Sequence, residues 1–154
     1  MREIYAGFTD RCEPFGMDEC WLDMTGCVGR EDALRTAQEV RQRVLDATGL
    51  TVSVGVSWCK AIAKLGSDYR KPNAVTVIDR ARFADIVWPL PVSSLLFAGR
   101  SSVRQLERHS GAVELTVMQL PLWRALSSTC PEKTKSPCIS TNSSSKAFFA
   151  SSME

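Results

Sequence analysis

The chain has 154 residues, of which 44% are hydrophobic and 23% are charged, enough apolar content for one globular domain with or without an appendage. Its formal net charge of +2 is only mildly basic, so charge alone neither requires nor excludes a nucleic-acid partner. No apolar stretch approaches the ~20 residues needed to cross a bilayer, and residues 1–8 lack the apolar core of a signal peptide. We therefore expect a cytoplasmic protein without a membrane segment.

The cysteine and histidine content argues against several kinds of site. None of the six cysteines forms a Cys-x-x-Cys pair, and His109 is the only histidine, which disfavours a zinc site. A single histidine also argues against hydrolases built on Ser-His-Asp or Cys-His arrangements. In the expected compartment the cysteines should be reduced and behave mostly as small buried apolar residues.

The first predicted elements are the end of a helix and a β-hairpin. Residues 1–10 have apolar side chains on one side of a helix, with no start signal before them. A short strand over 11–15 leads into a turn at Gly16. A buried strand over 19–25 then returns as the second arm of the hairpin.

Two adjacent carboxylates stand at the start of that second strand. Asp18 and Glu19 lie just ahead of an apolar run that includes Trp21 and Leu22. Carboxylates at the start of an apolar strand are energetically unfavourable unless a cation neutralises them. Ligands that are all oxygen atoms favour magnesium over zinc as that cation. The alternative is a solvated turn with two ordinary surface acids.

The clearest predicted helix covers 31–48. Its apolar residues repeat at helical spacing and form one stripe: Ala33, Ala37, Val40 and Val44. The residue that follows the helix, Gly49, is a typical stop signal.

Residues 50–57 alternate so regularly that they predict a strand with two different faces. One face is apolar and carries Leu50, Val52, Val54 and Val56. The other face is small and carries Thr51, Ser53, Gly55 and Ser57. The apolar face must pack on helices, whereas the small face allows something bulky to lie close to it.

A second helix is predicted over 59–68, with Lys60 and Lys64 on one face because they are four residues apart. A short strand over 75–78 and a helix over 80–87 follow. This order of elements, with one further strand expected upstream, predicts an α+β fold: a mixed antiparallel sheet with helices on one face.

A second, smaller unit is expected over 89–126. It contains a short helix over 99–109 and a candidate helix over 114–126. Beyond these, 127–154 is rich in serine and threonine with few apolar anchors, and we expect this tail to be disordered.

Three stretches, in this order and spacing, resemble the palm of Y-family translesion DNA polymerases, in particular the bacterial DNA polymerase IV branch. They are Glu13–Asp23, then Ser53–Ser57 with Lys60, Ala63 and Lys64, then Lys71-Pro72-Asn73. The resemblance covers roughly 1–120. It implies an incomplete ferredoxin-like palm over 1–88, followed by a thumb-like helix-hairpin-helix region over 89–126.

The resemblance implies a role for each matching residue. Asp18 and Glu19 match the carboxylates that hold two magnesium ions, and Lys60 matches the lysine that contacts the triphosphate of the incoming nucleotide. Two ions about 4 Å apart clamp the attacking and leaving oxygens, and a nearby lysine offsets the triphosphate charge. Asp23 matches a recurrent acid for which we expect a structural role.

In the thumb-like region, four residues match the loop that holds DNA backbone phosphates through helix N-terminal amides. They are Gly99, Arg100, Ser101 and Ser102. Phe97 stands where the family has an earlier glycine of that loop. The alternative is a plain surface helix without a role in DNA binding.

Several parts of the family are missing from these motifs. The first catalytic aspartate, the fingers and the C-terminal DNA-binding domain have no counterpart, and Cys59 stands where the family usually has asparagine. We therefore expect an internal piece of a polymerase with little or no activity alone.

The expected function of the whole family member is template-directed DNA synthesis past lesions during DNA repair. Its expected partners are primer–template DNA and deoxynucleoside triphosphates, with a sliding clamp as a further candidate. Two other classes stay open. Nucleotidyl cyclases that make cyclic dinucleotides share a Gly-x-Asp-Glu hairpin, which Gly16–Glu19 superficially fits. The third class is a non-catalytic DNA-binding remnant.

Overall fold

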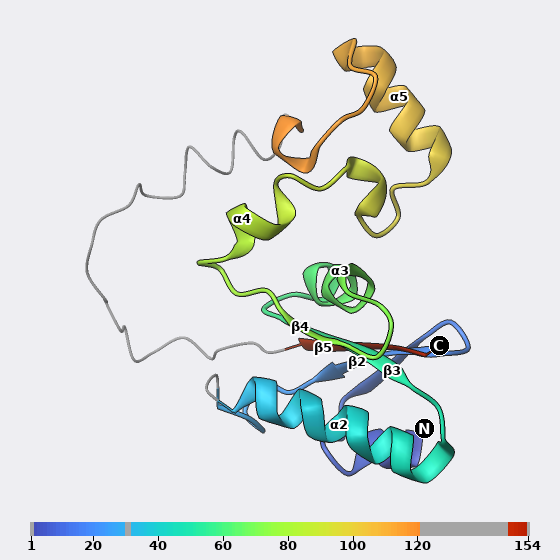
Figure 1. Cartoon of the computed structure of the whole chain (residues 1–154), viewed down its shortest axis with the longest axis vertical. Coiled ribbons are helices and arrows are strands. Elements are labelled where there is room, and N and C mark those ends of the chain that lie inside the picture. Colours follow the sequence, from blue (N-terminus) through green and yellow to red (C-terminus); the bar gives the residue numbers. More distant parts are fainter. Residues whose placement is uncertain (1, 30–31, 121–147, 154) are drawn as a thin grey trace, which may run out of the picture. The chain divides into compact units, whose positions relative to one another are not determined.

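A computed structural model describes residues 2–29, 32–120 and 148–153 (Figure 1). The chain forms two compact units, one from Met1–Arg80 with Ser144–Glu154 and the other from Ala81–Ser143. The predicted boundary at 88 therefore lies inside the second unit. Within the described ranges, every helix is too short or too polar to cross a bilayer.

The first unit is a five-stranded mixed sheet with helices, which confirms the predicted α+β class. Its helices are α1 (Arg2–Ala6), α2 (Ala33–Thr48) and α3 (Lys60–Tyr69). Its strands are β1 (Cys12–Phe15), β2 (Glu19–Asp23), β3 (Val52–Ser57), β4 (Val75–Val77) and β5 (Phe148–Met153). The strand order is β1-β2-β5-β3-β4, in which β3 and β4 are parallel and the other neighbours are antiparallel.

The centre of this sheet comes from a strand late in the sequence (Figure 1). β5 pairs with β2 on one side and with β3 on the other, so that Ser152 lies opposite both Glu19 and Ser53. The described side chains of β5 are all buried: Phe149, Ala150, Ser151 and Ser152.

The prediction of a disordered tail over 127–154 is therefore wrong for 148–153. This short segment is ordered because the edges of β2 and β3 supply backbone hydrogen-bond partners on both of its sides. The rest of the predicted tail, 127–147 and residue 154, lies outside the described residues.

One face of the sheet packs on α2 and forms the main core. The stripe predicted for 31–48 is buried as expected, against valines of β3, Leu22 of β2 and Phe149 of β5. Helix α2 ends at Gly49, whose φ of 71° and N–H bond to the Leu45 carbonyl form a left-handed cap.

The other face of the sheet accepts α3 because Gly55 has no side chain. A Cβ on Gly55 would overlap the Ala63 carbonyl and would lie 2.8 Å from the carbonyl carbon of Gly66. The small face predicted for 50–57 therefore accommodates the backbone of a helix. Since α2 and α3 cover opposite faces (Figure 1), the prediction that the helices lie on one face is wrong.

The second unit contains short helical elements, of which the longest has no buried residue. They are α4 (Phe83–Val87), η1 (Val92–Ser94), α5 (Arg100–Ser110) and η2 (Val117–Gln119). The predicted helix over 99–109 is confirmed as α5. The candidate helix over 114–126 is wrong for its described part, where η2 is the helical element, and 121–126 lies outside the described residues.

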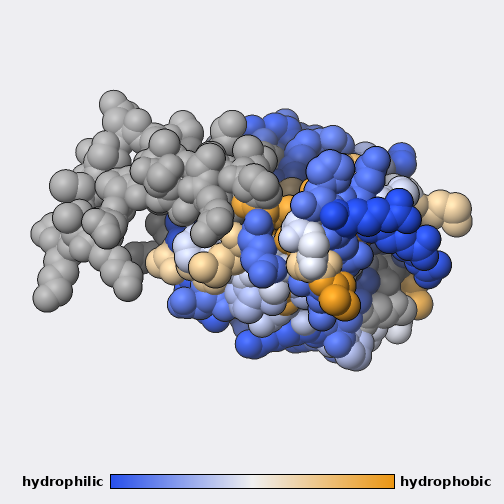
Figure 2. Space-filling view, turned by 90° about the horizontal axis from the view of Figure 1, so that it is seen from above, coloured by the Kyte–Doolittle hydropathy of each residue, from blue (hydrophilic) through white to orange (hydrophobic). Residues whose placement is uncertain are grey.

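The surface offers little apolar area in the view of Figure 2, where most residues are hydrophilic and apolar ones are scattered among them. The most exposed large apolar side chains of the described residues are Met17, Phe97 and Val113. Scattered apolar side chains of this kind are ordinary on soluble proteins and do not mark a docking surface.

The close contact at Gly55 gives a first prediction. Gly55→Ala should lower the free energy of unfolding by roughly 3 kcal/mol, because the new methyl group meets helix backbone that cannot rotate away. Urea unfolding followed by circular dichroism measures this change. Gly29→Ala is the matched control, since its Cβ would meet only Asp32 Oδ2 at 3.7 Å. Equal unfolding midpoints for both variants would contradict the packing described here.

The buried thiol of Cys20 gives a second prediction. Burial raises its pKa from 9.0 to about 11, so above pH 9 the unfolded chain releases a proton that the folded chain retains. Stability should therefore fall as the pH rises from 9 to 11. Between pH 8 and pH 10 the loss from this group should be roughly 1 kcal/mol. Urea unfolding of the wild type and of Cys20→Ala at both pH values isolates the contribution of Cys20. Burial also raises the pKa of Tyr5, but Tyr5 is common to both chains. An equally steep decline in the variant would count against this assignment.

Candidate functional site

The β1–β2 hairpin places the two predicted acids at one end of the sheet, where they differ in environment. Gly16 adopts a φ of +76° in the turn, which glycine tolerates without strain. Asp18 follows in the same turn and is exposed. Glu19 begins β2 opposite Phe15, and its side chain is only 21% exposed.

Glu19 is paired with Lys64 of α3, not with the lysine singled out from the sequence. Lys64 Nζ lies 3.1 Å from Glu19 Oε1 and also contacts the Asp68 carboxylate one turn further along α3. The side chain of Lys64 is only 10% exposed. Since a largely buried ammonium group is costly without carboxylate partners, Glu19 and Asp68 offset the cost of burying Lys64.

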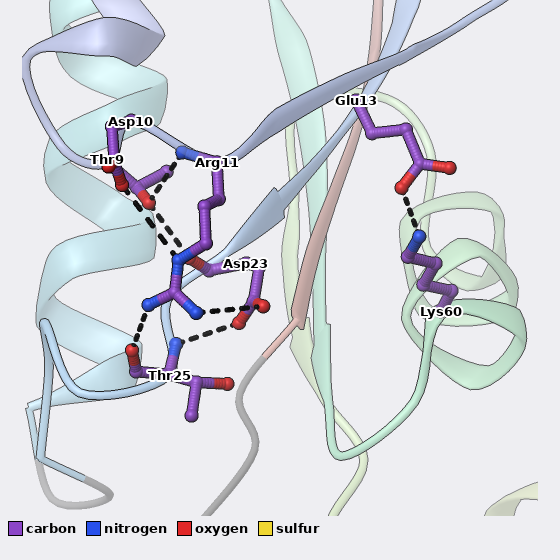
Figure 3. Close-up of polar contacts among 7 residues, drawn as sticks. All are labelled: Thr9, Asp10, Arg11, Glu13, Asp23, Thr25 and Lys60. Carbon is purple, nitrogen blue, oxygen red and sulfur yellow. Dashed lines mark hydrogen bonds and ion pairs between the residues drawn. The ribbon is translucent and has the colours of Figure 1, made fainter.

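Lys60 reaches the same face of the sheet at a neighbouring position. Its amine pairs with the Glu13 carboxylate of β1 (Figure 3) and lies 5.6 Å from the centroid of the Trp21 ring. Glu13 is opposite Trp21, and Trp21 is two residues from Glu19, so all three side chains project to the side of α3. Lys60 and Glu19 are therefore not separated by the core.

Ser152 of β5 joins Glu19 to a third lysine. Lys71 Nζ donates to Ser152 Oγ at 2.7 Å, and Ser152 Oγ donates to Glu19 Oε1 at a longer 3.4 Å. Lys71 Nζ also lies 3.1 Å from Asp68 Oδ1. We refer to Glu19, Lys64, Asp68, Lys71 and Ser152 as the Glu19 cluster.

Two members of the Glu19 cluster, Asp68 and Ser152, were not singled out from the sequence. Asp68 could have been found, because it follows Lys64 by four residues and precedes Lys71 by three, both of which are helical neighbour spacings. No local signal points to Ser152, since its contact with Glu19 depends on a strand that arrives from far along the chain.

Asp23, at the other end of β2, has structural contacts (Figure 3). Its Oδ1 accepts the backbone N–H of Thr25 at 2.9 Å, and its Oδ2 lies 3.3 Å from Arg11 Nη1. Arg11 Nη2 also donates to the Thr25 carbonyl. These contacts fix the end of β2 to the turn that follows, at the opposite end of the strand from Glu19.

The carboxylates among the described residues do not by themselves assemble a two-ion site. Across 2–29, 32–120 and 148–153 there is no group of three or more His, Cys, Asp or Glu side chains arranged to hold a metal ion. Magnesium commonly uses one or two protein carboxylates and completes its shell with water and phosphates. Asp18 is available for such a role, whereas Glu19 could serve only if Lys64 released it.

The predicted DNA-binding residues belong to the second unit, at the start of α5. Gly99 caps this helix in an extended conformation, and Arg100, Ser101 and Ser102 are exposed in its first turn. The first-turn amides of a helix have no intrahelical acceptor, which suits an anion. Phe97, where the family has glycine, adopts a left-handed φ of +67°, a conformation favourable for glycine but not for a bulky residue.

Comparison with known proteins assigns this fold. Residues 1–68 match the impB/mucB/samB (IMS) family. The chain is 49% identical over 106 residues to DNA polymerase IV of Acetivibrio thermocellus, a match covering 68% of this chain and 27% of that protein. It is 37% identical over 123 residues to DNA polymerase IV of Francisella philomiragia, a match that covers 79% of this chain and 35% of that protein.

Solved structures give the same assignment. DinB from Sulfolobus solfataricus superposes with a TM-score of 0.63 at 28% identity, covering 71% of this chain and 33% of that one. A post-insertion binary complex of Dbh DNA polymerase superposes with a TM-score of 0.65 at 28% identity, covering 70% of this chain and 32% of that one. The chain thus spans only about a quarter to a third of the proteins that it matches. Over this shared part, the chain is similar to Y-family DNA polymerases.

Proposed function

We propose that this chain is a portion of a Y-family polymerase that performs template-directed DNA synthesis past lesions. The observation that carries the proposal is the placement of Glu19 and Lys60 on one face of a sheet, inside the stretch that matches polymerases. The matched relatives are named DNA polymerase IV, and Dbh polymerase is described in binary and ternary complexes. Primer–template DNA and deoxynucleoside triphosphates are the proposed partners, with a sliding clamp as a further one.

In the whole protein, we propose that Asp18 and Glu19 contribute to binding two magnesium ions and that Lys60 contacts the nucleotide triphosphate. Bound divalent ions would stabilise negative charge during nucleotidyl transfer. Within this chain, Asp18 is exposed, Glu19 is neutralised by Lys64, and Lys60 is paired with Glu13. These pairings support the proposal that the isolated chain is inactive as a polymerase.

A primer-extension assay tests this inactivity. The purified chain, with magnesium, all four deoxynucleoside triphosphates and a primed template, should give no extension, because the described carboxylates do not assemble a two-ion site. A full-length DNA polymerase IV in the same buffer is the positive control. Robust extension by the 154-residue chain would overturn the proposal.

A second candidate function is a DNA-binding remnant without catalysis. The observation that favours it is the exposed first turn of α5, where Gly99, Arg100, Ser101 and Ser102 present backbone amides and one guanidinium group to solvent. We propose that these residues bind DNA phosphates in either case. No contact among the described residues favours the nucleotidyl cyclase alternative.

Phosphate binding at α5 gives a further prediction. Arg100→Ala should weaken binding to a short primed duplex and reduce the slope of log K against log salt by about 1, the value expected for one lost phosphate contact. Fluorescence anisotropy over a salt series measures both quantities. Arg35→Ala is the control, because Arg35 on α2 is 81% exposed and pairs with a neighbour three residues earlier, Asp32. An unchanged slope for Arg100→Ala would remove the proposed contact.

A further inference from the structure

The central position of β5 makes the rest of the sheet an acceptor for a strand. β2 pairs with β1 and β3 pairs with β4, but the described ladders join these two pairs only through β5. Without β5, β2 and β3 would each present a row of unpaired N–H and C=O groups to the same gap. We call this gap, between Glu19–Asp23 and Val52–Ser57, the strand slot.

The strand slot selects side chains as well as backbone. On the α2 side, it buries Phe149 completely within the core and lets Ser151 Oγ meet the Tyr5 hydroxyl at 2.5 Å. On the α3 side, Ala150 lies opposite both Trp21 and Gly55 and is 1% exposed, so a small residue is required. Ser152 on that side meets Lys71 and Glu19.

The slot therefore recognises an extended segment with a large apolar residue, a small residue and two hydroxyl residues in succession. Main-chain hydrogen bonds on both sides provide affinity, and the alternating side-chain positions provide specificity, as in other cases of strand addition. The segment Phe148–Met153 has this pattern. Every recognition contact comes from residues before Pro72 on one partner and from β5 on the other.

None of these contacts requires the two partners to be covalently linked. In the sequence, residues 121–147 separate β5 from the preceding described residue, Leu120. Tethering generally raises the effective concentration of a bound segment only to about the millimolar range. An identical segment from another copy, at comparable concentration, meets the same slot with the same contacts.

We propose that the strand slot binds the segment Phe148–Met153 in trans, so that a second copy of this chain can donate its C-terminal strand to this one. Reciprocal donation closes a two-fold dimer without any new contact, since each slot is filled by the partner's strand. Because Ser152 touches Glu19 and Lys71, the donating copy also completes the Glu19 cluster of the receiving copy.

The first test opens the slot in the full chain and offers the strand as a peptide. Ala150→Pro removes a backbone donor from the middle of β5 and should free the slot. A fluorescent peptide with the sequence of residues 144–154 should then bind saturably, as measured by anisotropy. The same peptide carrying Phe149→Asp is the matched control and should bind at least about 100-fold more weakly, since burying an unpaired carboxylate is costly. The wild-type chain, whose slot is filled, should also bind the peptide more weakly than the variant.

The second test uses the unmodified chain. After incubation at about 1 mM in mild urea followed by dilution, size-exclusion chromatography with light scattering should show a species of twice the 17.0 kDa chain mass. The Phe149→Asp chain should not form it. If circular dichroism shows the Ala150→Pro chain to be folded and it fails to bind the peptide, the proposal is wrong. If the Ala150→Pro chain is unfolded and the peptide does not restore its fold, the dimerisation experiment on the wild-type chain decides. A wild-type chain that stays at 17.0 kDa at every concentration overturns the proposal.

Discussion

The contact between Gly55 and the backbone of α3 is the constraint on which the site depends. Because a side chain cannot fit at Gly55, α3 lies directly on β3. Helical spacing then carries Lys60 and Lys64 over the face that β1 and β2 present, where they meet Glu13 and Glu19. A wider separation between helix and sheet would hold both amines out of reach of these carboxylates.

The pairing of charges on this face explains why an apolar sheet tolerates so many ionisable groups. Lys64 lies between Glu19 and Asp68, and Asp68 in turn contacts Lys71. Each charge therefore has a partner of opposite sign, which offsets much of the cost of removing it from water. The same pairing gives Glu19 a cation of the protein's own, so binding an external metal there would require rearrangement of Lys64. In this chain, the Glu19 carboxylate is thus already paired with the Lys64 ammonium group.

The sequence predicted those features whose signals are local. The stripe of α2, the hairpin at Gly16 and the alternation of β3 follow from spacing within short windows, and each is confirmed. The sequence also predicted that something would lie close to the small face of β3. It could not identify α3 as the occupant, and so it placed the helices on a single face, because periodicity within an element does not specify which side of a sheet its neighbour covers.

The features that could not be predicted depend on contacts between distant residues. The segment Phe148–Met153 follows a stretch rich in serine and threonine, and no local signal pairs it with a particular strand; it forms a strand because the edges of β2 and β3 both pair with it. For the same reason Ser152 could not be recognised as a neighbour of Glu19. The pairing of Lys60 with Glu13 likewise needed the register of the hairpin, which sequence alone leaves open.

The position of β5 has a consequence for the order in which the molecule forms during translation. The ribosome completes β2 and β3 long before it reaches Phe148, yet these two strands have no direct pairing with each other. Until the later segment emerges, a nascent chain holds two separate ladders with exposed edges, the antiparallel β1–β2 pair and the parallel β3–β4 pair, and intermediates of this kind recruit chaperones. Formation of the sheet should therefore be a late and slow event, because it waits for β5.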